Sequence, residues 1–115
     1  MNSALPQLDP LLHQPVRTRI VAFLSGRGEA TFNELKRALS ITDGNLGAHL
    51  GKLVEAELVA SHEDAANARP QTVFALTRRG RGALATYVAQ LSSLVQLSAE
   101  VPAPSLRAPR KRALR

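Results

Sequence analysis

The sequence predicts an α+β fold that is mostly helical, with three short helices, a two-stranded hairpin and a long closing helix. Three observations support this order. Apolar residues recur at helical spacing up to residue 57, two short runs with partial period-two alternation follow, and helical spacing returns after residue 77. This is the order of a helix-turn-helix motif followed by a wing, so the chain is expected to form a winged helix-turn-helix.

The first helix is defined by its end signals. Asp9 and Pro10 have the pattern of a cap and a first-turn proline, and Pro15 restarts the helix after an expected break near Gln14. The run SGRG at residues 25–28 is expected to end the helix, because glycine adopts the left-handed backbone conformation at little steric cost.

Two more helices begin with clear caps. Thr31 and Glu34 form the capping-box pattern T-x-x-E, which starts a short second helix. Thr42 suits the N-cap of the third helix, and Asp43 lies where the positive end of the helix dipole favours an anion. We therefore expect the third helix to span residues 43 to about 57.

The third helix is amphipathic. A helical wheel at about 100° per residue places an apolar stripe on one side, consisting of Leu46, Leu50, Leu53 and Val54. The stripe is expected to pack inward. The opposite face carries small and hydrogen-bonding side chains, so it can approach another macromolecule closely. Its members are Gly44, Asn45, Ala48, Lys52 and Glu55, with His49 and Gly51 at its edges.

A hairpin and a long helix complete the predicted domain. LVASHE (58–63) and QTVFAL (71–76) are the expected strands, and DAANARP (64–70) is the seven-residue loop between them. Thr77 is the expected cap of the last helix, whose apolar residues alternate spacings of three and four. This stripe covers the domain core alone or also forms a symmetric dimer seam. We favour the seam, which consists of Leu84, Tyr87, Val88, Leu91, Leu94 and Val95.

The length of 115 residues corresponds to one domain. We expect this domain to cover residues 9–101, between a flexible N-terminus at 1–8 and a disordered basic tail at 102–115. The formal net charge is +6, but five of the cations lie in the tail, which leaves residues 1–106 at +1. Net charge alone is therefore weak evidence for a nucleic-acid partner.

Several classes of function are not expected. The absence of cysteine excludes disulfides and thiolate metal sites, and the histidines are scattered, so neither a metal nor another cofactor is expected. No nucleophile motif or phosphate-binding glycine loop indicates an enzyme. No stretch approaches the roughly 18 apolar residues of a membrane span, and no signal sequence is apparent, so we expect a cytoplasmic protein without membrane contact.

Two segments carry a resemblance to a known family. TDGNLGAHLGKLVEAELV, from Thr42 to Val59, and FALTRRGRGAL, from Phe74 to Leu84, resemble the small single-domain winged-helix transcriptional regulators of the MarR/ArsR-like superfamily. The resemblance covers roughly residues 9–97. It implies a homodimer that binds double-stranded DNA in a sequence-specific way and regulates transcription. Gly47 and Gly51 depart from the family pattern, because many relatives carry serine, arginine or lysine there.

The resemblance also implies which residues contact DNA. The third helix would enter the major groove, and the wing would contact the flanking minor groove or backbone. The positive charge at the start of the last helix, read from the residues themselves, could neutralise phosphates. The residues are Thr42, Asn45, Ala48, His49 and Lys52 on the helix, Asn67 and Arg69 on the wing, and Arg78 and Arg79 on the last helix.

The chemistry of these residues leaves alternatives open. Asn45 can pair with an adenine edge and Lys52 with guanine or a phosphate, yet both also suit an ordinary helix surface. His49 contacts DNA or packs beside Leu53, and Arg69, held extended by the proline that follows it, suits a minor groove or an exposed turn. A winged-helix module for protein interaction or RNA is the alternative function. A small-molecule effector is compatible with the fold, but no group of polar residues in the sequence indicates a binding site for one.

Overall fold

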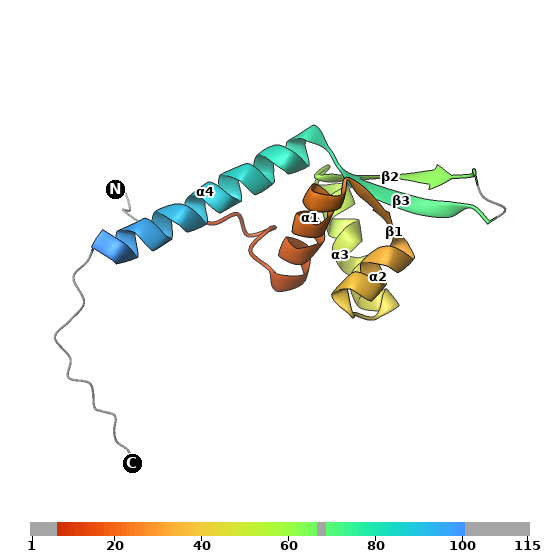
Figure 1. Ribbon diagram of the computed structural model, residues 1–115, viewed down its shortest axis with the longest axis horizontal. Coiled ribbons are helices and arrows are strands. Elements are labelled where there is room, and N and C mark those ends of the chain that lie inside the picture. The colour runs from red at the N-terminus through yellow and green to blue at the C-terminus, as the bar shows by residue number, and fades with distance from the viewer. Residues whose placement is uncertain (1–6, 67–68, 101–115) are drawn as a thin grey trace, which may run out of the picture.

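The computed structural model of the chain describes residues 7–66 and 69–100, and it confirms the predicted winged helix-turn-helix (Figure 1). Asn67 and the basic tail therefore lie outside the described residues. The elements, in chain order, are α1 (Pro15–Arg27), β1 (Glu29–Thr31), α2 (Phe32–Leu39), α3 (Asp43–Glu55), β2 (Val59–Asp64), β3 (Gln71–Leu76) and α4 (Arg78–Glu100).

The segment before α1 forms a single hydrogen-bonded turn. The Asp9 side chain accepts from the backbone N–H of Leu11 at 2.9 Å, and the Asp9 carbonyl accepts from the N–H of His13 at 2.8 Å. The helix itself begins at Pro15 with Gln14 as its N-cap, so the predicted restart is confirmed, while the preceding turn does not extend into a helix. The helix ends at Arg27, and its C-cap Gly28 has a φ of 98°, which favours glycine.

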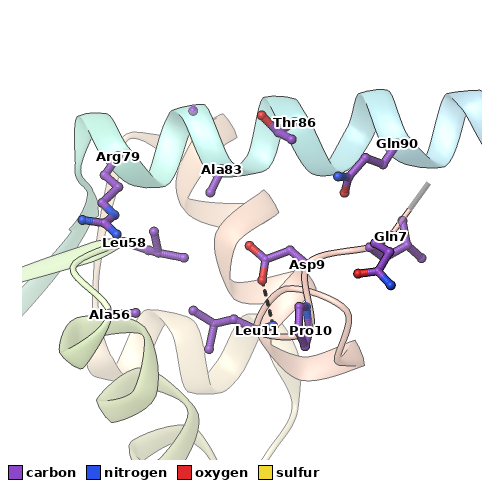
Figure 2. A pocket seen from close by; sticks show the side chains of 12 residues that line it. Gln7, Asp9, Pro10, Leu11, Ala56, Leu58, Arg79, Ala83, Thr86 and Gln90 are labelled. Carbon is purple, nitrogen blue, oxygen red and sulfur yellow. Dashed lines mark hydrogen bonds between the residues drawn. The ribbon is translucent and has the colours of Figure 1, made fainter. Parts of the chain in front are cut away.

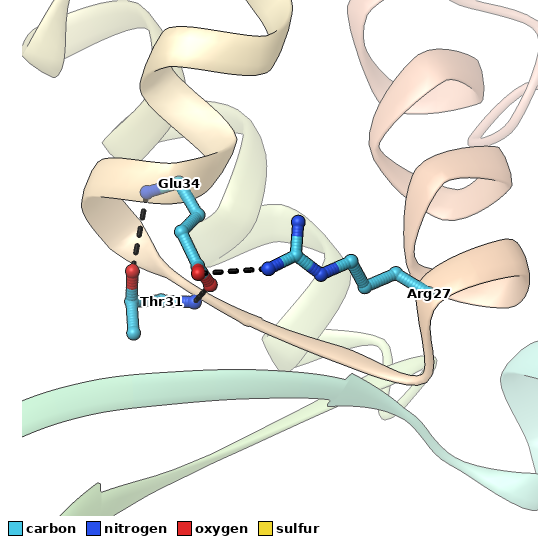
Figure 3. A network of polar contacts seen from close by, with 3 residues as sticks. All are labelled: Arg27, Thr31 and Glu34. Carbon is cyan, nitrogen blue, oxygen red and sulfur yellow. Dashed lines mark hydrogen bonds and ion pairs between the residues drawn. The ribbon is translucent and has the colours of Figure 1, made fainter.

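The caps of α2 and α3 are formed as predicted. The Thr31 hydroxyl accepts from the backbone N–H of Glu34 at 3.1 Å, and the Glu34 carboxylate accepts from the N–H of Thr31 at 2.9 Å. Arg27 donates to the same carboxylate at 2.8 Å, which ties the end of α1 to the start of α2 (Figure 3). The Thr42 hydroxyl accepts from the N–H of Asn45 at 3.1 Å and starts α3 at Asp43.

The sheet contains one strand more than the predicted hairpin. Its order is β1-β3-β2, with both neighbours antiparallel to β3, and β1 pairs Ala30 with Phe74. A strand of three residues has no measurable alternation, so the sequence pattern could not show it. Asp64 pairs with Gln71, so the loop of the hairpin spans residues 65–70 and is one residue shorter than predicted.

The core lies where α1, α2 and α3 pack against the sheet and the first half of α4. Its largest fully buried side chains are Leu12, Ile20, Leu24, Leu35, Leu46, Leu53, Val21 and Val59. The residues before α1 join this core as well, because Leu8 and Leu11 pack against it. The described segment from residue 7 onward is therefore part of the packed domain.

Helix α4 and the hairpin leave the core in opposite directions, and the second half of α4 projects beyond the other elements (Figure 1). The Thr77 hydroxyl accepts from the N–H of Gly80 at 2.9 Å, which confirms the predicted cap. Among the described residues, no helix combines the length and the apolar character needed to cross a membrane.

Candidate nucleic-acid interface

Helix α3 presents the two faces that its sequence predicts. Leu46, Leu50 and Leu53 are buried, with exposures of 3% or less. Asn45 and Lys52 on the opposite face are exposed, as are the small residues Gly44, Ala48 and Gly51. Val54, which the predicted stripe included, is 36% exposed, so the prediction that it packs inward is wrong. The face of hydrogen-bonding and small side chains is thus open over the length of the helix.

The turn between α2 and α3 places a cation beside the start of this face. Lys36 forms an ion pair with Asp43, with Nζ and Oδ1 2.8 Å apart. The two side chains are 43% and 69% exposed, so the pair adds little stability. Its main consequence is that the ammonium group lies beside the N-terminal end of α3.

His49 lies at the edge of the open face and is half-buried. Its Nδ1 is 3.1 Å from Nη1 of Arg17 on α1. Burial lowers the pKa of His49 from its ordinary value, and the positive charges of Arg17 and Lys52 lower it further. The imidazole is therefore neutral near pH 7. The contact to α1 differs from the packing beside Leu53 that the sequence suggested as an alternative.

The remaining candidate residues come from elements other than α3, and the structure brings Arg79 close to its C-terminal end. Arg79 is 3.6 Å from Glu57, just beyond the C-terminal end of α3, and Arg78 beside it is exposed. Arg69 lines a groove of about 320 Å³ between the hairpin and the start of α2, together with Phe32. The structure therefore gathers the helix residues on one surface, with Arg79 at one end. The position of Asn67 is outside the described residues.

A pocket of about 500 Å³ lies between residues 7–11 and α4, next to Ala56 and Leu58 at the C-terminal end of α3 (Figure 2). Asp9, Thr86 and Gln90 supply polar side chains to its lining. The Oε1 atom of Gln90 is buried and has no hydrogen-bond partner within the described part of the chain. Across residues 7–66 and 69–100, no group of three or more histidine, aspartate or glutamate side chains is placed to hold a metal ion.

Arg17 is the residue that the sequence analysis missed. It lies 32 positions before His49, and no local pattern connects a helix surface arginine to a side chain at that separation. Tyr87 also lies elsewhere than predicted. It is only 5% exposed and its hydroxyl is 2.9 Å from Nδ1 of His13, so it belongs to the core rather than to an exposed seam.

The comparison with known families decides the identity of this fold. A family model described as a winged helix DNA-binding domain matches residues 16–95, which is most of the described chain. The chain belongs to this winged-helix DNA-binding family.

Individual relatives of the winged-helix chain agree with this assignment. An uncharacterized protein from Methanocaldococcus jannaschii is 36% identical over 84 residues, which cover 73% of this chain and 91% of the relative. A transcriptional regulator homologue from Pyrococcus horikoshii is 30% identical, with a TM-score of 0.73 over 79% of this chain and 89% of that one.

A more distant solved structure shares the fold of the winged-helix chain. A MarR family transcriptional regulator from Silicibacter pomeroyi is 20% identical, with a TM-score of 0.60 over 78% of this chain and 59% of that one. This likeness shows the fold alone, and the family model over residues 16–95 confirms the predicted resemblance to winged-helix DNA-binding proteins.

Proposed function

We propose that this winged-helix protein is a sequence-specific transcriptional regulator that binds double-stranded DNA as a homodimer. Helix α3 would lie in the major groove, and the wing, about residues 64–70, would contact the flanking minor groove or backbone. The observation that carries the proposal is the open face of α3, which no other described element covers. Membership of a DNA-binding family supports the same conclusion.

The side chains of this face suit the major groove. Asn45 offers an amide donor and acceptor that match the edge of adenine, and Lys52 donates to guanine or to a phosphate. Ala48 lies between them on the helix and leaves room for close approach. Thr42 caps the helix through its hydroxyl oxygen and keeps its own proton for an acceptor on DNA.

Cations at the borders of α3 would contact phosphates. Lys36 lies at its N-terminal end, Arg78 and Arg79 lie beyond its C-terminal end, and Arg69 extends from the wing. Phosphate contacts fix the orientation of a protein on the duplex but carry no sequence information. We propose the same role for Asn67, and a nonspecific attraction to polyanions for the basic tail.

The proposed dimer seam lies on the apolar residues of α4 that the single chain leaves exposed. Val88 is 51% exposed and Val95 is 68% exposed, although both are apolar. Leu91 lies between them at helical spacing and is 36% exposed. We propose that a second copy covers this surface, together with the partly buried Leu84 and Leu94. A two-fold dimer would place its recognition helices about 34 Å apart, one turn of DNA.

Selection from a pool of random duplexes tests this function. We expect enrichment of an inverted repeat whose half-sites are about 10 base pairs apart, centre to centre. The affinity of the selected duplex should also fall with salt, with a log-log slope of about −0.9 for each phosphate contacted. Enrichment of half-sites at unrelated spacing would contradict the dimer geometry, and no enrichment would contradict sequence-specific binding.

A winged-helix module for RNA or protein is the second candidate. The observation that favours it is charge, since residues 1–106 carry a net charge of only +1 and the open face of α3 contains a single lysine. A competitor RNA that displaces the selected duplex at equal concentration would favour this candidate. On either proposal the protein binds without a catalytic step of its own and acts in the cytoplasm.

A further inference from the structure

Arg17 connects three parts of the domain through its side chain and its backbone. Its Nε donates to the carbonyl oxygen of Leu11 at 2.6 Å, in the turn before α1. Its Nη1 is 3.1 Å from Nδ1 of His49 on α3. Its backbone N–H donates to the side chain of Gln14 at 2.8 Å. The guanidinium is therefore held between the N-terminal turn and α3, with its plane fixed by two hydrogen bonds.

This contact determines the protonation of His49. A guanidinium group has donors but no acceptor, so Nδ1 of His49 must accept and must carry a lone pair. In a neutral imidazole the single proton then lies on Nε2. Burial and the neighbouring charges of Arg17 and Lys52 lower the pKa of the ring, which favours its neutral form. No group within the described residues forms a hydrogen bond with Nε2.

We propose that Arg17 is a positioning residue that holds His49 in the Nε2–H tautomer, so that α3 presents a hydrogen-bond donor of fixed identity to the DNA bases. The inference rests on the proposed function and adds a specificity to it. An N–H donor is matched by N7 or O6 of guanine, N7 of adenine and O4 of thymine. Cytosine presents only its amino group there, so it should be rejected at the base that His49 contacts.

The tautomer can be measured without DNA. Two-bond proton–nitrogen correlation spectra of the free full-length protein near pH 7 report which ring nitrogen of His49 carries the proton. We expect an unprotonated Nδ1 in the wild type and a mixture of tautomers in Arg17→Met. Arg19→Met is the matched control, because Arg19 lies on the same helix and donates to the carbonyl of Leu39 instead. A proton on Nδ1 in the wild type, or unchanged spectra in Arg17→Met, would overturn the inference.

The consequence for recognition is tested on the duplex obtained by selection. Each base of one half-site is replaced in turn by cytosine, and the base opposite it by guanine. Fluorescence anisotropy then gives the ratio of the affinity for the original duplex to the affinity for the replaced duplex. We compare ratios because Arg17→Met and Arg19→Met each remove one positive charge, which weakens binding to all DNA sequences alike and cancels in the ratio. For the wild type we expect discrimination against cytosine at the bases that Asn45 and Lys52 contact, and at one further position a preference of about fivefold, the size of one net hydrogen bond.

The variants then separate the two proposals. Arg17→Met should lose most of that preference, whereas Arg19→Met should keep it. If Arg17→Met keeps the preference while the wild type binds the selected duplex, the role of Arg17 is wrong and the proposed function stands. If the wild type binds no duplex at low salt, the proposed function fails, whatever tautomer the spectra show.

Discussion

A Cβ atom added to Gly80 would lie 2.1 Å from the carbonyl oxygen of Leu58, so α4 begins in direct backbone contact with the residue that precedes β2. The same carbonyl accepts a hydrogen bond from the backbone N–H of Thr77 at 3.0 Å. This contact fixes the direction in which α4 leaves the domain relative to α3. In the proposed dimer, it therefore sets the separation of the two recognition helices.

Gly80→Ala should destabilise the domain. The added methyl group would overlap a backbone atom that cannot rotate away, and overpacking of this kind costs about 1–3 kcal/mol. Chemical denaturation measures the change. Gly82→Ala is the control, because a Cβ there meets nothing within 4 Å, and this variant should be up to about 1 kcal/mol more stable than the wild type. Equal stability of the two variants would show that the close approach does not exist.

The glycines on the open face of α3 should behave in the opposite way. A Cβ on Gly44 or Gly51 meets no atom of the protein within 4 Å. Each alanine variant should therefore gain about 1 kcal/mol of stability from helix propensity. If DNA approaches this face, the new methyl groups should also weaken binding to the selected duplex. A gain in stability with unchanged affinity for DNA would place the duplex elsewhere.

The capping box predicts a dependence of stability on pH. The hydrogen bond from the backbone N–H of Thr31 lowers the pKa of Glu34 from the ordinary value of 4.5, and the charge of Arg27 acts in the same direction, against a smaller effect of burial. A lowered pKa means that the unfolded chain binds the proton first as the pH falls. The ionised Glu34 side chain thus contributes fully to the stability of the folded domain above about pH 4.5. This contribution is lost as the pH falls further and passes the lowered pKa.

The variant Glu34→Gln isolates this contribution. Its stability should be lower than that of the wild type at pH 7, and the difference should shrink as the pH falls below 4.5. Denaturation curves of both proteins across this range give the difference directly. A difference that stays constant down to the lowest pH would mean that the carboxylate charge plays no part in the cap.

Val95→Asp should dissociate the dimer and leave the monomer folded. The side chain is 68% exposed in the single chain, so a charge there costs the domain little, but the same charge would be buried in the proposed seam. Sedimentation equilibrium together with circular dichroism separates the two effects. Ser93→Asp is the control, because residue 93 is exposed on the other side of α4. If both variants sediment as the wild type does, α4 does not form the seam through Val95.

The parts of the fold that the sequence predicted correctly are those set by local patterns. The capping residues Thr31, Thr42 and Thr77 each make the predicted hydrogen bond, and the leucines of α3 are buried as their spacing required. Strand β1 was missed because it forms through pairing with β3, more than 40 positions away, and has no pattern of its own.

The candidate site was predicted less completely for the same reason. Helical periodicity identified the open face of α3, since a face is a local property. The neighbours of that face come from other elements, and the contact of Arg17 with His49 depends on how α1 and α3 pack. The helical spacing of Tyr87 predicts a place in the seam. In the structure its hydroxyl contacts His13, a residue before α1, and the side chain is buried in the core.

The variant Asn45→Ala removes from the open face of α3 the amide group that is proposed to pair with a base edge. Fluorescence anisotropy should be measured for the wild type and the variant on the selected duplex and on a shuffled duplex of the same composition. If α3 reads base edges, the variant should lose about 1–3 kcal/mol of binding free energy on the selected duplex and almost none on the shuffled one. An equal loss on both duplexes, or no loss on either, would contradict the reading of base edges by α3.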